Sequence, residues 1–284
     1  MSKFILSAFG DEIADDLKTQ MDVLEQHGVS HIEMRGVNGR PLVQHTLEEA
    51  ADIRKELDRR GFKISSVGSP IGKINITDDF EAHLELFRHT VKIAGILGAG
   101  YIRMFSFFIP KGENPEKYRD EVLRRWREFI RESEGSGLVL LHENEKDIYG
   151  DTPERCLDLL ESLDCSYLKA VFDPANFVQC DVKTYPEAFE MLRDHSVYFH
   201  IKDALYKDHS VVPSGYGDGS LPEIIRELHR SGYEGFLSLE PHLGAFSGLA
   251  ALEQDLNMAN LPEGGAGTFA IAANALKKIL GSLD

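Results

Sequence analysis

The feature that most constrains the fold is a regular alternation of short apolar runs with longer amphipathic stretches. The runs are rich in β-branched and aromatic residues, as buried parallel strands are. We predict eight strands, at Phe4–Ala8, His31–Arg35, Lys63–Gly68, Tyr101–Ser106, Leu138–Glu143, Leu168–Asp173, Val197–Lys202 and Phe236–Glu240. Successive runs begin about 33 residues apart, the length of a βα unit. Eight such units predict an α/β fold, a (β/α)8 TIM barrel.

Between the runs, apolar positions recur with the period of amphipathic helices. The predicted helices are Ile13–His27, Leu47–Arg60, Phe80–Leu97, Glu116–Glu134, Pro153–Leu163, Pro186–Asp194, Leu221–Ser231 and Phe269–Leu280. Thr46 and Thr152 carry hydroxyls of the kind that cap helix N-termini, and a proline follows Thr152 at the first helical position. A doubly wound sheet is the structural alternative, but it favours a glycine-rich first turn, which does not follow Ala8.

Length and charge limit the classes of protein to which the chain can belong. A chain of 284 residues suits one large α/β barrel, and we predict a single domain over residues 1–284. The net charge of −16 repels phosphate backbones and anionic lipids, which argues against nucleic-acid and membrane partners. No apolar run reaches the roughly 20 residues of a membrane span. Three cysteines without a CxxC pair favour a reduced, cytoplasmic setting.

Polar side chains end four neighbouring strands of the predicted barrel, in the strings HENE, DPAN, HIKD and EPH. Because the carboxyl ends of barrel strands meet at one mouth, Glu143, Asp173, His200 and Glu240 are expected to lie together. Taken singly, Asp173 could cap a turn and His200 could be a core histidine. Three clustered carboxylates, however, raise one another's pKa and cost stability unless a cation lies between them. The set predicts a divalent metal ion, Mn²⁺ first, with Mg²⁺, Co²⁺ or Zn²⁺ as alternatives.

The strings HENE, YGDTPE, FDPAN, HIKD and LSLEPH resemble the sugar phosphate isomerase/epimerase family, the xylose isomerase-like TIM barrels, over nearly the whole chain. The resemblance implies that Glu143, Asp173, His200 and Glu240 bind the metal ion. It also implies that Glu143 and Glu240 are acid and base on opposite faces of a keto sugar. Many members have a histidine three residues after the metal-binding aspartate, where this chain has Asn176, which weakens a direct match to ketose 3-epimerases. We reject the abasic-site endonucleases of the family, because their extra histidines are missing and the net charge opposes DNA.

The predicted chemistry is a proton shift next to a carbonyl. A Lewis-acidic ion at the carbonyl stabilises an enediolate by several kcal/mol, and a carboxylate base contributes about 10²–10⁴-fold. Return of the proton to the other face epimerises the sugar, and its return to the neighbouring carbon isomerises it. We therefore predict a metal-dependent sugar isomerase or epimerase acting on a small ketose or polyol ketone. A lyase that dehydrates a keto-inositol or keto sugar is the alternative, and a non-catalytic sugar-binding protein is a further one.

Four more residues are candidates for substrate binding. They are Glu33, Asn176, Lys202 and His242. Glu33 could instead form a salt bridge with Arg35 or Arg103 at the barrel rim, and Lys202 could form a surface ion pair. His242 could be a loop residue or the partner of a ligand. The family implies a small carbohydrate as partner and often forms dimers or tetramers, so the prediction allows a homo-oligomer.

Three loops follow strand ends, where barrels place active-site segments. The glycine-rich stretch 215–219 is interpreted as a turn, with phosphate contact as the alternative, because it lacks the Lys-Ser/Thr of a P-loop. The longer stretches Phe107–Pro115 and Pro241–Thr268 are candidates for lids. A surface excursion without function is the alternative for both.

Overall fold

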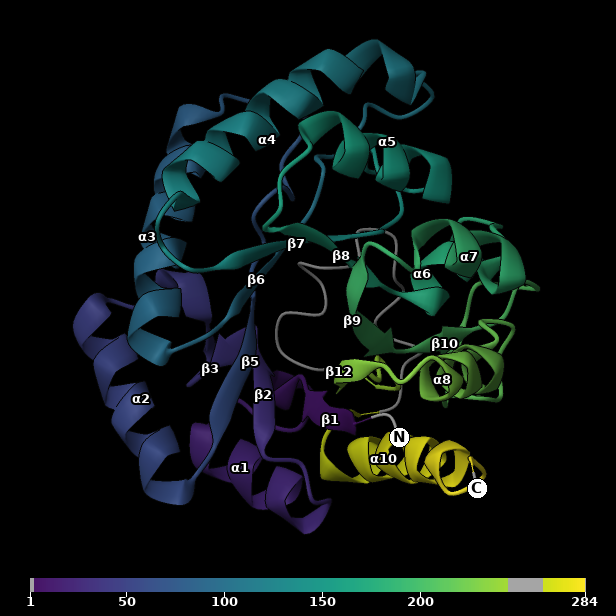
Figure 1. The fold of residues 1–284 in the computed structure, drawn as a ribbon. Helices are drawn as coiled ribbons and strands as arrows, with labels where there is room; N and C mark the ends of the chain where they lie inside the picture. The colour runs from purple at the N-terminus through teal and green to yellow at the C-terminus, as the bar shows by residue number, and fades with distance from the viewer. Residues whose placement is uncertain (1–2, 245–262, 284) are drawn as a thin grey trace.

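The computed structural model describes residues 3–244 and 263–283. In this part of the chain, eight parallel strands close a barrel in the order β1-β2-β5-β6-β7-β8-β9-β12, and β12 pairs with β1 (Figure 1). The strands are β1 (Lys3–Ala8), β2 (His31–Met34), β5 (Lys63–Gly68), β6 (Tyr101–Met104), β7 (Val139–Glu143), β8 (Leu168–Phe172), β9 (Ser196–Ile201) and β12 (Glu234–Leu239). Each lies within two residues of a predicted run, so the predicted (β/α)8 barrel is confirmed.

Helices surround the strands on the outside of the barrel (Figure 1). They are α1 (Leu17–Gln26), α2 (Leu47–Arg60), α3 (Glu81–Leu97), α4 (Arg119–Ser133), α5 (Pro153–Leu163), α7 (Phe189–Leu192), α8 (Leu221–Arg230) and α10 (Ala266–Leu280). Helices α2 and α5 have the predicted bounds, and both N-terminal threonines act as caps. The Thr46 hydroxyl accepts the Glu49 N–H while the Glu49 carboxylate accepts the Thr46 N–H, and the Thr152 hydroxyl accepts the Arg155 N–H.

Helical segments differ most from the prediction in three places, and α4 and α10 begin three residues later and three residues earlier than predicted. The first helix is predicted from Ile13 but begins at Leu17, because the Asp16 carboxylate accepts the Thr19 N–H and starts the helix there. The helix predicted over Pro186–Asp194 consists of a π-helical turn, Thr184–Ala188, followed directly by α7. A short helix, α6 (Pro174–Gln179), was outside the prediction, since six residues are too few to show a helical period.

Two short hairpins extend from the mouth of the barrel and were also outside the prediction. Strands β3 (Gly36–Val37) and β4 (Arg40–Pro41) follow β2, and strands β10 (Asp203–Ala204) and β11 (Val211–Val212) follow β9. Two-residue strands carry too little pattern to be read from sequence. Both hairpins stand beside the site described below.

Beneath the mouth, the interior of the barrel is filled by apolar side chains and by hydroxyl groups that hydrogen-bond to one another. At the mouth, the side chains are charged. Leu141, Val171 and Tyr198 pack together inside the barrel. The Tyr198 hydroxyl lies 2.9 Å from Ser65 Oγ, which lies 2.6 Å from Ser7 Oγ, so the polar atoms of this layer are paired. Because alternate residues of a strand face the same side, the residues two positions after Leu141, Val171 and Tyr198 also face inward. These are the predicted site residues on β7, β8 and β9.

Of the two long loops predicted as candidate lids, the structure describes the first in full and only the ends of the second. Phe107, in the loop after β6, is fully buried, with its ring centroid 6.0 Å from those of Phe80 and Phe129, so this part of the loop packs the helical layer. Residues 245–262 of the other predicted lid, Pro241–Thr268, lie outside the described residues. Among the helices that the structure describes, none is both long and apolar enough to cross a bilayer.

A buried histidine makes the loop after β5 sensitive to acid. His83 on α3 accepts the Gly72 N–H through Nε2 at 2.7 Å, and burial, helped by the charge of Arg125, lowers the pKa of His83 to about 4. The unfolded chain binds this proton near pH 6.5, so stability is lost as the pH falls from 6.5 toward 4. We expect the His83 contribution to lower the free energy of unfolding by about 2 kcal/mol between pH 7 and pH 5.

Urea unfolding of wild type and His83→Gln at both pH values measures this term. The amide of glutamine can accept the same N–H but does not titrate, so the variant should lose about 2 kcal/mol less than wild type over this interval. His209→Gln, at a half-exposed position, is the control and should behave as wild type. Equal losses in wild type and His83→Gln would contradict the assignment.

Candidate metal centre and active site

The four residues predicted to bind a metal ion meet at the mouth of the barrel. Glu143 ends β7, Asp173 follows β8, His200 lies near the end of β9, and Glu240 follows β12. Each offers one ligand atom, and these atoms all lie within 4.8 Å of one another. All four side chains are buried, with at most 3% of any residue exposed. The sequence prediction that these residues converge is therefore confirmed.

The distances from His200 to the three carboxylates fit ligands of one metal ion. His200 Nδ1 lies 3.1 Å from Glu143 Oε1, 3.3 Å from Glu240 Oε2 and 3.4 Å from Asp173 Oδ2. Ligand atoms bonded to one ion at about 2.1 Å, with angles of about 90–110°, stand about 3.0–3.4 Å apart. Glu143 Oε2 and Asp173 Oδ2 are buried and accept no hydrogen bond of good geometry within the described residues. The cluster could therefore hold a divalent cation.

The local structure around Asp173 leaves one of its oxygens for the cluster. Asp173 Oδ1 accepts the Asn176 N–H at 2.9 Å and caps α6. The Asn144 side chain donates to the Asp173 carbonyl and accepts the Asp173 N–H, both at 2.9 Å. The capping and ligand interpretations of Asp173 are thus compatible, because each uses a different oxygen.

Glu33 contacts the far side of the imidazole. Its carboxylate lies 3.2 Å from His200 Nε2. When Nδ1 binds a metal ion, this contact would keep the remaining proton on Nε2. Burial lowers the pKa of His200, but Glu143, Glu33 and Glu240 outweigh it and hold the pKa well above its usual value. Arg103 lies 3.8 Å from Glu33, which matches one of the two salt bridges considered from sequence.

Lys202 lies inside the cluster instead of on the surface. Its Nζ is 2.9 Å from Asp173 Oδ2 and 3.1 Å from Glu240 Oε2, and only 3% of the residue is exposed. Burial lowers the pKa of Lys202, but Asp173 and Glu240 outweigh it and raise the pKa well above its usual value. The interpretation of Lys202 as a surface ion pair is therefore wrong, because the strand end carries it into the mouth.

Asn176 and His242 also contact the cluster. Asn176 Nδ2 lies 3.2 Å from Glu143 Oε1, so its amide can orient that carboxylate. His242 Nε2 lies 3.5 Å from both Glu12 Oε1 and Glu240 Oε1, and the backbone N–H of His242 donates to Glu12 Oε2 at 2.7 Å. The structure thus places all four predicted substrate-binding residues at the mouth, each beside a predicted ligand or its neighbour.

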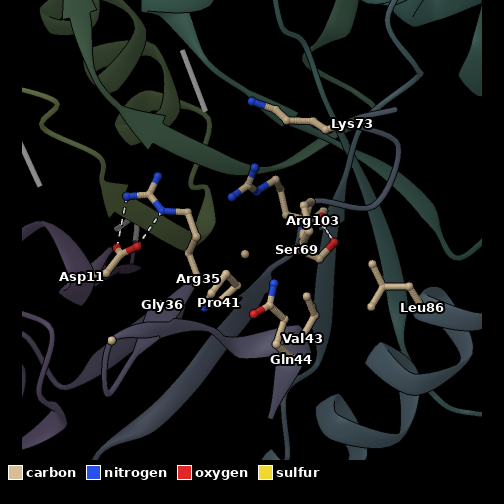
Figure 2. A pocket seen from close by; sticks show the side chains of 13 residues that line it. Asp11, Arg35, Gly36, Pro41, Val43, Gln44, Ser69, Lys73, Leu86 and Arg103 are labelled. Carbon is tan, nitrogen blue, oxygen red and sulfur yellow. Dashed lines mark hydrogen bonds and ion pairs between the residues drawn. The ribbon is translucent and has the colours of Figure 1, made fainter. Parts of the chain in front are cut away.

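Sequence reasoning did not anticipate the network that surrounds Arg35. Arg35 binds Asp11 through two nitrogens, at 2.8 and 3.1 Å (Figure 2). It also donates to Glu240 Oε1 at 3.0 Å. Burial raises the pKa of Glu12, which also accepts from Arg35. On the other side, Arg103 Nη1 lies 3.2 Å from Glu143 Oε2. Both arginines are at or just past strand carboxyl ends, so the rule that found the ligands also points to them.

The glycine-rich stretch 215–219 forms a turn around a buried carboxylate. Asp203 accepts the backbone N–H groups of Gly215, Gly217 and Gly219 at 2.8, 3.1 and 2.9 Å. A Cβ atom at Gly217 would lie 2.3 Å from Asp203 Oδ1, which explains the glycine there. The turn interpretation is confirmed, and these three N–H groups point at Asp203, which disfavours the phosphate alternative.

Comparison with known proteins agrees with this fold and site. The sequence profile of the "Xylose isomerase-like TIM barrel" family matches residues 21–260. The chain therefore belongs to the xylose isomerase-like TIM barrel family. No curated protein matches the sequence significantly.

Solved structures similar to this chain include a 3-epimerase-like protein, a zinc-binding protein and a probable dehydratase. A D-tagatose 3-epimerase-like protein is 17% identical, with a TM-score of 0.75 over 99% of this chain and 98% of that one. The IOLI protein with a bound zinc atom is 16% identical, with a TM-score of 0.76 over 99% of both chains. The probable 3-DHS dehydratase AsbF from Bacillus anthracis is 18% identical, with a TM-score of 0.73 over the full length of both chains. At these identities the likeness establishes the shared barrel.

Proposed function

We propose that this protein is a metal-dependent sugar isomerase or epimerase that moves a proton next to the carbonyl of a small ketose or polyol ketone. The observation that carries the proposal is the cluster of Glu143, Asp173, His200 and Glu240 within 4.8 Å at the mouth of the barrel. Epimerases among the similar structures agree with it.

The donor set favours a hard divalent ion. Three carboxylate oxygens and one imidazole nitrogen suit Mn²⁺, Mg²⁺ or Co²⁺, and we propose Mn²⁺, with Zn²⁺ as an alternative. When bound, such an ion polarises a carbonyl and lowers the energy of the negative charge that follows proton removal.

The side chains of this chain supply the proton transfer. Burial raises the pKa of Glu240, but Lys202, His200 and His242 outweigh it and hold the pKa well below its usual value, so Glu240 is ionised near neutral pH. An ionised carboxylate can accept a proton from carbon, and Glu143 at the end of β7 can return one. Asn176 orients Glu143, and Arg35 orients Glu240.

A lyase is the second candidate function, and Lys202 favours it. Its buried ammonium group lies beside both Asp173 and Glu240 and could stabilise, as a cation, the negative charge that develops on the oxygen of a leaving β-hydroxyl. The dehydratase among the similar structures is consistent with such chemistry on this barrel.

Exchange of solvent deuterium tests both functions. Mn²⁺-loaded protein is incubated in D₂O with a panel of ketoses and inososes, and NMR and mass spectrometry follow the carbon-bound hydrogens and the products. Exchange without a change of formula identifies an isomerase or epimerase, and loss of water identifies a lyase. Binding without exchange would leave a sugar-binding protein and sink the proposal.

Two variants connect the exchange to the proposed residues. Glu143→Gln and Glu240→Gln should each lower the exchange rate by about 10²–10⁴-fold, because each removes an acid–base group. Glu48→Gln, on the exposed face of α2, is the matched control and should keep the wild-type rate. Unchanged exchange in either active-site variant would refute the assignment of that glutamate.

A further inference from the structure

We propose that the substrate carries an anionic group, a carboxylate or a phosphate, which Arg103 and Lys73 bind in a pocket beside the metal cluster. This inference rests on the proposed function and names the substrate class for the same site. It follows from the shape of the pocket, the bonding of Arg103 and the chemistry of the wall.

The pocket has a volume of about 390 Å³. Arg35, just after β2, and Arg103, on β6, line the side of the pocket that is next to the cluster. Arg35 and Arg103 line it and also contact Glu240 and Glu143, so the pocket and the cluster share a boundary. The candidate metal ligands come from β7, β8, β9 and β12, whereas the pocket lies across the mouth. A molecule that reacts at the cluster can therefore extend its other end into the pocket.

The two sides of the pocket differ in character. In the view of Figure 2, the charged ends of Arg35, Arg103 and Lys73 lie on one side, and Pro41 and Val43 lie on the other. The side with Pro41 and Val43 can cover the carbon skeleton of a ligand, and the Gln44 amide lies on this side too. The charged side supplies N–H donors.

Arg103 has buried donors that the described residues do not use. Its side chain is 3% exposed, and its Nε and Nη2 donate no hydrogen bond within residues 3–244 and 263–283. Ion pairs reach it from Glu143 at 3.2 Å and Glu33 at 3.8 Å, and both carboxylates are also turned to His200. Buried charged donors without acceptors are costly. A ligand oxygen in the pocket would satisfy them.

Phe105 holds the two cations in place. The Arg103 guanidinium lies 4.7 Å from the centroid of the Phe105 ring, and Lys73 Nζ lies 4.5 Å from the same centroid. Lys73 also contacts Glu145 at 3.0 Å. Both cations thus have fixed positions before a ligand arrives, which lowers the cost of binding.

The chemistry of this wall selects an anion over a neutral sugar. Arginine and lysine have no hydrogen-bond acceptor, so they cannot pair with the O–H donors of a polyol as a mixed site can. A guanidinium fork matches two oxygens of a carboxylate or a phosphate. Asp11, the one carboxylate lining the pocket among the described residues, is already bound by both nitrogens of Arg35.

Isothermal titration calorimetry with Mn²⁺-loaded protein tests the proposal. The probes are D-fructose as the neutral sugar, D-fructose 6-phosphate as the phosphate and 5-keto-D-gluconate as the carboxylate. At least one anion should bind about tenfold or more tightly than D-fructose, the change expected from one charge-assisted contact. The anion that binds more tightly shows whether the substrate carries a phosphate or a carboxylate. If neither binds more tightly than D-fructose, the proposal is overturned.

Variants separate a binding role from a structural one. Arg103→Met should bring the affinity for the anion to within threefold of the affinity of the same variant for D-fructose. Lys73→Met provides the same test at a second position if Arg103→Met does not fold. Arg131→Met, at an exposed position on α4, is the matched control. Anion preference that persists in both pocket variants would overturn the proposal.

This measurement is independent of turnover. Preference for an anion without any deuterium exchange would refute the proposed function and keep the anion site. Deuterium exchange into a neutral sugar without a preference for anions would support the proposed function and refute the anion site.

Discussion

Replacing Asp173 with asparagine should remove most of the divalent metal that the protein binds and lower its turnover by on the order of a thousandfold. Asp173 Oδ2 faces the cluster, whereas Oδ1 caps α6. Asparagine keeps the shape and a capping oxygen but removes the negative charge, so the fold should persist while the cation is bound more weakly. The loss of several kcal/mol of charge stabilisation sets the size of the effect.

Elemental analysis of the purified protein, together with the exchange rate at saturating substrate, checks this result. Asp52→Asn, at an exposed position on α2, is the control and should keep both metal content and rate. Thermal melting of both variants without added metal verifies that they are folded. Stoichiometric metal and a wild-type rate in Asp173→Asn would show that the ligand assignment is wrong.

The charges at the mouth indicate why a cation is expected there. Buried ion pairs contribute little to stability, because removing charges from water costs about as much as their attraction returns. Within the described residues, Lys202 and His200 lie amid Glu143, Asp173 and Glu240 and hold these carboxylates close. The side chains are thus positioned before the ion binds, as functional sites require. A cluster of buried charges such as this one is better explained by a role in binding and catalysis than by a contribution to the stability of the fold.

The barrel could be predicted from sequence because its signals are local. Each strand is a short apolar run, the helices between have a clear period, and caps such as Thr46 and Thr152 mark their beginnings. The short helix α6 and the β3–β4 and β10–β11 hairpins could not be predicted, because they have too few residues to show a period.

The four candidate ligands could be predicted because each stands at the end of a strand, and barrel topology alone brings strand ends together. The partners of charged side chains could not be predicted in this way. Lys202 has the sequence of an ordinary surface lysine beside Asp203, and only the tertiary structure places it between Asp173 and Glu240. For the same reason, Arg103 was considered as a rim salt bridge, and its unused donors became apparent only in the structure.

The second large effect is on stability. Replacing Asp203 with alanine should lower the free energy of unfolding by about 3 kcal/mol or more. Asp203 is fully buried and, besides three glycine N–H groups, accepts the Ala204 N–H at 3.0 Å. Removing the carboxylate leaves several N–H groups in the turn without an acceptor, and each such group costs about 1–3 kcal/mol unless water replaces the partner.

Urea unfolding, followed by circular dichroism, measures the loss. Asp203→Asn keeps one acceptor oxygen and should lose less than Asp203→Ala, whereas Asp208→Ala, exposed in the same hairpin, should lose less than about 1 kcal/mol. Gly217→Ala tests the turn from the other side, because its Cβ would lie 2.3 Å from Asp203 Oδ1 and must displace the carboxylate. If Asp203→Ala and Gly217→Ala both unfold at the wild-type urea concentration, the turn does not depend on this carboxylate. A loss in both, with Asp208→Ala unchanged, shows that the buried carboxylate organises the loop after the strand that carries His200.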